Sequence, residues 1–90
     1  MSVEAAGVMR EWDLAVQHFE AAIQAHDREG AVTAQVHTLH NYARMLLMRN
    51  ARGDRAQSKK LVTRGLTLAA EHGLAHLGEK LAHLTGTGHP

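Results

Sequence analysis

The hydrophobic residues of the chain recur at helical spacing, and they do so most regularly between Trp12 and Gly30. This stretch carries apolar residues three and four positions apart on one helical face: Trp12, Ala15, Val16, Phe19, Ala22 and Ile23. A stripe of this width is typical of an amphipathic helix whose apolar side faces a core. The alternation of small and large residues within it favours close packing against a neighbouring helix.

The same periodicity predicts about five helices in all. The first is a short helix over residues 2–9, which a tight connection at Arg10–Glu11 joins to the second. Three longer helices follow over 12–28, 32–50 and 55–72. The last is a short helix whose apolar seam consists of Leu74, Leu77, Leu81 and Leu84. The predicted loops are two to five residues long, which makes consecutive helices antiparallel neighbours. No stretch alternates as a strand would. We therefore expect one all-α domain over 1–84, built of antiparallel helical hairpins, and a flexible tail over 85–90.

The small-large-small pattern of Ala15, Phe19 and Ala22 returns 43 positions later, and Gly73 closes the second segment as Gly30 closes the first. The second copy of the pattern consists of Ser58, Val62 and Gly65. This pattern on one helix of a pair is typical of a tetratricopeptide repeat, and the chain resembles a short α-solenoid of that kind.

A wider resemblance rests on three segments, W-D-x-A-x-x-H-F-E-A-A-I, N-Y-A-R-M-L-L and R-G-D-R-A. Over residues 5–84 the chain is similar to the tetratricopeptide-like C-terminal regions of large bacterial signalling proteins. These include LuxR-type transcription regulators with an ATPase module and ATPase-linked nucleotide cyclases. The DNA-binding and nucleotide-hydrolysing modules of such proteins have no counterpart here. The resemblance therefore implies an interaction scaffold, a fragment or small relative of such a regulator.

Two surfaces are candidates for protein contacts. The first is apolar and comprises Trp12, Val16, Phe19 and Ile23, because a seven-residue helix before them is too short to cover their face. We expect this face either to drive self-association or to mark a piece of a longer solenoid. The second is an inner groove lined by Asn41, Tyr42 and Arg44. For Tyr42 the commoner alternative is a packed ring with its hydroxyl at the rim.

Charge is distributed unevenly although the whole chain carries only +1. Residues 1–31 hold six acidic and two basic side chains, whereas residues 32–65 hold seven basic and one acidic. Besides Arg44, the basic residues form a candidate patch: Arg49, Arg52, Arg55, Lys59, Lys60 and Arg64. Such a patch could bind nucleic-acid phosphates, attract an acidic partner or the acidic third of another copy, or form a solvated helix face.

Catalytic and metal-binding motifs are missing from the sequence. The chain has no cysteine, no GxSxG, no HExxH and no phosphate-binding loop. His37 and His40, and His72 and His76 with His83 beyond them, are spaced for one helical face, but Gly73 interrupts the second set and no carboxylate accompanies either. We therefore predict a non-catalytic protein without cofactor or metal. No segment is apolar enough to serve as a signal peptide or membrane span, so a cytoplasmic location is expected.

Overall fold

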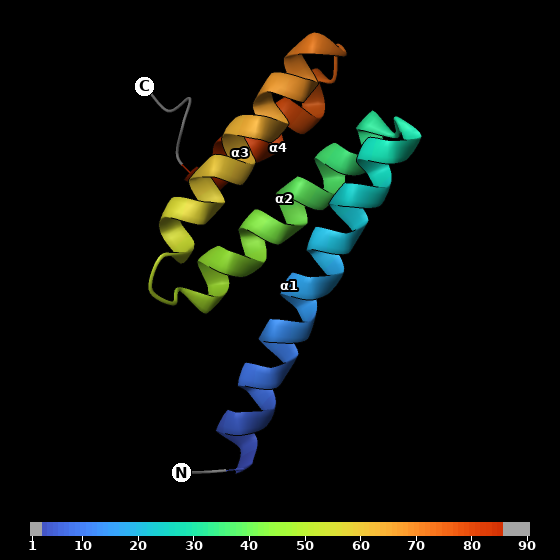
Figure 1. The fold of residues 1–90 in the computed structure, drawn as a ribbon. Coiled ribbons are helices and arrows are strands. Elements are labelled where there is room, and N and C mark those ends of the chain that lie inside the picture. Colours follow the sequence, from blue (N-terminus) through green and yellow to red (C-terminus); the bar gives the residue numbers. More distant parts are fainter. Residues whose placement is uncertain (1–2, 86–90) are drawn as a thin grey trace.

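The computed structural model describes residues 3–85, with side chains from Met9 onward, and this part of the chain is all-helical. It forms four helices, which are α1 (Val3–Glu29), α2 (Val32–Arg49), α3 (Asp54–Glu71) and α4 (Ala75–Thr85). Consecutive helices run antiparallel (Figure 1). The all-α prediction is thus confirmed, whereas the expectation of five helices is wrong. The predicted tail begins at Thr85, which is the last residue of α4, and its remaining residues 86–90 lie outside the described part.

The missing fifth helix results from the continuity of α1, which runs for 27 residues through Gly7 and the predicted connection at Arg10–Glu11. Arg and Glu are both good helix formers, and one internal glycine costs only about 1 kcal/mol relative to alanine. The apolar stripe also passes through this point, since Met9, Trp12 and Val16 keep spacings of three and four. Nothing local therefore ends the helix. The first part of α1 extends past the end of α2 instead of folding back on it (Figure 1).

Helix α2 occupies the centre of the domain. In the described part of the chain it packs against α1, α3 and α4, α3 also packs against α4, and α1 and α4 do not pack together. Most of the core therefore comes from α2, and the buried apolar cluster of the described side chains consists of Ile23, Val36, Leu39, Tyr42, Ala43, Met45, Leu46, Leu61, Val62, Leu77 and Leu81.

The turns after α1 and after α3 have the same geometry 43 residues apart. Gly30 and Gly73 both have φ of +68°, a left-handed conformation that glycine adopts without strain. Around them, matching backbone N–H groups donate to matching carbonyls: Ala31 to His26 (3.0 Å) and Leu74 to Ala69 (2.8 Å), then Gln35 to Ala31 (2.9 Å) and Gly78 to Leu74 (3.0 Å). The α1–turn–α2 and α3–turn–α4 segments thus share a local structure in the register that the sequence indicated.

The contact between α3 and α4 explains why a glycine stands in the middle of α3. A Cβ atom built on Gly65 would lie 2.7 Å from Cδ1 of Leu81, whose side chain is fully buried. Leu81 therefore occupies the space that a side chain at position 65 would need. The small residue lets the two helices approach closely.

Candidate interaction groove between α1 and α2

A groove of about 400 Å³ runs between α1 and α2, and no residue of α3 lines it. Two residues of α1 and four of α2 line it: Ala15, Phe19, Asn41, Arg44, Met45 and Met48. The α2 residues stand three or four positions apart, so one face of that helix forms the wall. The groove combines an apolar floor with one cation and one amide, a composition that suits a protein ligand more than a small charged metabolite.

Large apolar side chains are exposed at and around this groove. Met48 is 67% exposed, and on α1 Met9 is 65% and Leu14 is 46% exposed. Leu14 and Met9 do not line the groove, so Met48 is the exposed apolar residue that belongs to the groove itself. Methionine is flexible and polarisable, which lets it adapt to a bound surface.

The four residues of the predicted apolar face do not share one environment. Ile23 is only 7% exposed and belongs to the core, while Trp12, Val16 and Phe19 are half-buried and pack against it. Helix α2 covers them in part, whereas the sequence analysis expected their face to be left uncovered by a short preceding helix. Of the four, Phe19 alone lines the groove.

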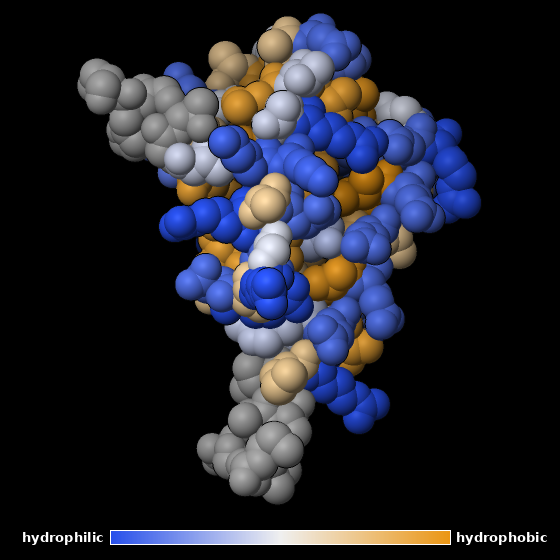
Figure 2. Space-filling view, turned by 60° about the vertical axis from the view of Figure 1, so that its left-hand side comes forward, coloured by the Kyte–Doolittle hydropathy of each residue, from blue (hydrophilic) through white to orange (hydrophobic). Residues whose placement is uncertain are grey.

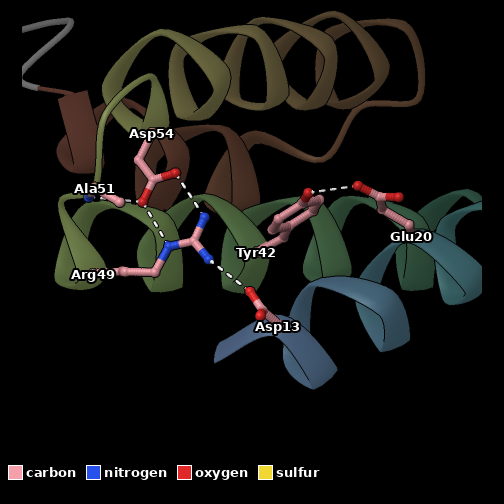
Figure 3. Close-up of polar contacts among 6 residues, drawn as sticks. All are labelled: Asp13, Glu20, Tyr42, Arg49, Ala51 and Asp54. Carbon is pink, nitrogen blue, oxygen red and sulfur yellow. Dashed lines mark hydrogen bonds and ion pairs between the residues drawn. The ribbon is translucent and has the colours of Figure 1, made fainter. Parts of the chain in front are cut away.

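Of the three residues of the predicted inner groove, Asn41 and Arg44 line the α1/α2 groove, whereas Tyr42 does not. The Tyr42 side chain is 3% exposed, and its ring stacks on Phe19 with centroids 5.3 Å apart. Its hydroxyl donates a hydrogen bond of 2.9 Å to Oε1 of Glu20 (Figure 3). Burial, with the Glu20 carboxylate beside it, raises the pKa of Tyr42 to about 12. Tyr42 thus holds Phe19 in place from behind and fixes the floor of the groove.

Arg49 joins three parts of the chain and is therefore not an open member of the basic patch. Its Nε and Nη2 atoms donate to the two oxygens of Asp54, both at 2.8 Å, and its Nη1 lies 3.7 Å from Oδ1 of Asp13 (Figure 3). Asp54 is buried and also accepts the backbone N–H of Ala51 at 2.9 Å. The hydrogen bonds from Arg49 hold the pKa of the Asp54 carboxyl below its usual value. This paired geometry fixes the loop between α2 and α3.

Arg64 is likewise engaged within the chain. It donates to Oδ2 of Asp27 at 2.9 Å, while the buried Gln35 amide donates to Oδ1 at 2.7 Å. The hydrogen bonds from Gln35 and then Arg64 lower the pKa of Asp27. This carboxylate therefore ties α1 to both α2 and α3. Part of the charge asymmetry seen in the sequence is thus balanced inside one molecule, which sequence spacing could not reveal because the partners are up to 37 residues apart.

Four members of the predicted basic patch remain open to solvent: Arg52, Arg55, Lys59 and Lys60. None of them pairs with a carboxylate in the described part of the chain. The face that brings α3 forward is mostly hydrophilic, with hydrophobic side chains visible between the polar ones (Figure 2). Arg55 and Lys59 also border a second groove, of about 350 Å³, together with Leu47, Ser58, Leu84 and Thr85.

The described histidines lie apart from one another or beside other polar groups. Among the described residues, no group of three His, Asp or Glu side chains could hold an ion. His40 contacts the side chain of Asn41 at 3.2 Å, and His72 and His76 stand on either side of the Gly73 turn. Over the same residues, no helix is both long and apolar enough to cross a membrane.

Comparisons of the chain with models of protein families, with curated proteins and with solved structures found no match.

Proposed function

We propose that this chain is a non-catalytic protein–protein interaction module, and that the α1/α2 groove is its main contact surface. The observation that carries the proposal is an apolar groove with a rigid floor and an exposed rim. Tyr42 and the α2 core fix Phe19 and Met45 from beneath, while Met48 and Arg44 stand open to solvent. Burial of such apolar surface gives affinity, and the cation gives orientation.

The 43-residue register supports a tetratricopeptide-like architecture as part of this proposal. Two helix–turn–helix segments with matching left-handed glycines and matching turn hydrogen bonds are what a two-unit helical repeat requires. The sequence resemblance to the C-terminal regions of bacterial LuxR-type regulators and cyclase-linked signalling proteins supports a scaffold role in such a system. A cytoplasmic location belongs to this proposal as well, and self-association is the alternative to a separate protein partner.

A second candidate, nucleic-acid binding, is favoured by the open cations on α3. It has less support than the groove, because Arg49 and Arg64 are engaged in ion pairs and Arg44 lies on the α1/α2 side. The cations of the predicted basic patch that stay open are Arg52, Arg55, Lys59 and Lys60, and the sequence around them has no aromatic residue that could stack on bases. Phosphate binding would weaken steeply with salt, whereas apolar docking would not.

The experiment is a retention assay with the immobilised chain and bacterial extract, run with and without nuclease treatment. At about 0.5 M salt, which screens exposed charges over a few ångströms, the wild-type chain should retain specific proteins from both extracts. M48E should lose them, and K60E, a charge change on α3 outside the groove, should keep them. Loss with K60E alone, or retention that nuclease abolishes, would support nucleic-acid binding instead. Equal retention by M48E and the wild type would refute a role for the groove.

A further inference from the structure

We propose that the α1/α2 groove is the binding site of an amphipathic partner helix that presents leucine-type side chains to the groove and a carboxylate to Arg44. This inference rests on the proposed function and specifies its ligand. It follows from the relation between the two grooves of the molecule, from the state of Arg44, and from the composition of α4.

The two grooves correspond in the 43-residue register. Ala15 and Asn41 line the first groove, and the residues 43 positions later, Ser58 and Leu84, line the second. The second groove lies between α3 and α4, and Leu47 of α2 closes its third side. The first groove lies between α1 and α2, and in the described chain these two helices alone line it. A helix that lay on α1 and α2 as α2 lies on α3 and α4 would therefore close the open side of the first groove.

Helix α2 shows what such an occupant looks like. Its buried positions include Val36, Leu39, Ala43 and Leu46, spaced at three and four residues along 18 residues. A partner helix with the same apolar spacing would insert side chains between Phe19 and Met48 as ridges enter grooves.

Charge defines the polar side of this partner. The hydrogen-bonded Arg–Asp pairs of the described residues, Arg49–Asp54 and Arg64–Asp27, each join different helices, and Arg49 also lies 3.7 Å from Asp13 of α1. Arg44 stands in the groove wall, exposed, and no carboxylate among the described residues pairs with it. A carboxylate on the incoming helix would complete a further pair of the same kind and would set its register.

A second copy of this chain fits the groove less well than a separate helix. The helix that would continue the array is α4, whose large apolar residues Leu77 and Leu81 are already buried in their own molecule. Where α2 carries Val36 and Leu39, the corresponding α4 positions carry Glu79 and Ala82. Placing Glu79 at an apolar helix contact would bury a charge.

The test uses two 18-residue fluorescent peptides, because the natural partner is unidentified. The basic peptide has the sequence of residues 32–49, and the acidic peptide has the same sequence with glutamate in place of both arginines. Anisotropy titrations should show the acidic peptide binding at least about tenfold more tightly to the wild-type chain. R44E should reverse this preference, and M48E should abolish binding of both. R55E, the same charge change on α3 outside the groove, should leave the preference within about twofold.

Each other outcome overturns the proposal in a recognisable way. If R55E reduces the preference as much as R44E does, the peptides sense overall charge and not the groove. If neither peptide binds while the extract assay still shows M48E-sensitive retention, the groove binds proteins but not a helix of this kind. If sedimentation shows a wild-type dimer that M48E dissociates, the occupant is a second copy. If the extract assay fails as well, the proposed function itself is refuted.

Discussion

The two glycines inside the second hairpin allow a direct test of its packing, because the same substitution should have opposite effects at the two positions. Gly65 lies in α3 and Gly78 lies in α4, both with ordinary helical backbone. Replacing a helical glycine by alanine gains about 1 kcal/mol of helix propensity. The sign of the net effect therefore depends on what the new methyl group meets.

At Gly78 the new Cβ would lie 3.7 Å from Cβ of Ala69, which is an ordinary contact, so Gly78→Ala should stabilise the protein by about 0.5–1 kcal/mol. At Gly65 it would lie 2.7 Å and 3.2 Å from the two methyl groups of Leu81. Leu81 is fully buried and cannot turn away without displacing its neighbours, and overpacking of this kind costs about 1–3 kcal/mol. After the propensity gain, Gly65→Ala should destabilise the protein by about 1 kcal/mol.

Urea denaturation followed by circular dichroism at constant pH measures both variants against the wild type. The two midpoints should move in opposite directions with an unchanged m-value, and the melting temperatures should differ by about 6–16 °C. If Gly65→Ala proves as stabilising as Gly78→Ala, Leu81 does not occupy the space above Gly65 and the described α3–α4 contact is wrong. A changed m-value would mean that the substitution altered the unfolded state and would require a different pair of sites.

Three further predictions concern the polar contacts. Asp54→Asn should lower the unfolding free energy measured by urea denaturation by about 2 kcal/mol, because it weakens a buried, charge-assisted contact with Arg49. Asp13→Asn should lower it by under about 1 kcal/mol, because its 3.7 Å contact with Arg49 is exposed. Equal losses in the two variants would contradict this reasoning. The pKa values of Asp54 and Asp27 in the folded chain lie below the value of about 3.9 for an unfolded aspartate. The two carboxylates therefore stabilise the fold above about pH 3.9, and this stabilisation should be lost as the pH falls through their folded-state pKa values. Asp54→Asn should make the stability in acid denaturation curves depend less on pH. Tyr42 is the single tyrosine, so its ionisation can be followed by absorbance. The titration midpoint should lie near pH 12 in the folded chain and near pH 10 in denaturant, and Glu20→Gln should lower the midpoint of the folded chain. A midpoint at pH 10 in the folded chain would contradict the burial of Tyr42 beside Glu20.

Local signals in the sequence were enough to predict all three turns between the described helices. The helices over 32–50 and 55–72 were placed within one residue at each end, because Gly30, Gly53 and Gly73 mark turns with positive φ. The break at Arg10–Glu11 was wrong because a glycine without a cap or a proline does not end a helix when the apolar stripe continues.

The candidate groove could be predicted only in part. Phe19, Asn41 and Arg44 were singled out as contact residues, and they do lie together. Met45 and Met48 were not singled out, although their spacing of four and seven from Asn41 places them on the same face of α2. The placement of Tyr42 behind Phe19 depends on the crossing of α1 and α2, and the engagement of Arg49 and Arg64 depends on contacts between helices. Neither can be read from the spacing within one helix.

The charge distribution shows how the structure changes the argument about partners. The acidic first third and the basic middle suggested attraction between copies of the chain. In the structure, Asp13 and Asp27 of α1 instead pair with Arg49 and Arg64 of the same molecule. Among the described residues, Arg44 in the α1/α2 groove and the open cations at and near the start of α3 are left without a carboxylate partner. A long-range attraction between opposite thirds is therefore weakened as a cause of association. Specific recognition at the α1/α2 groove becomes the stronger explanation, because there Arg44, unpaired among the described residues, stands beside the exposed Met48 and the half-buried Phe19, which a partner can bury.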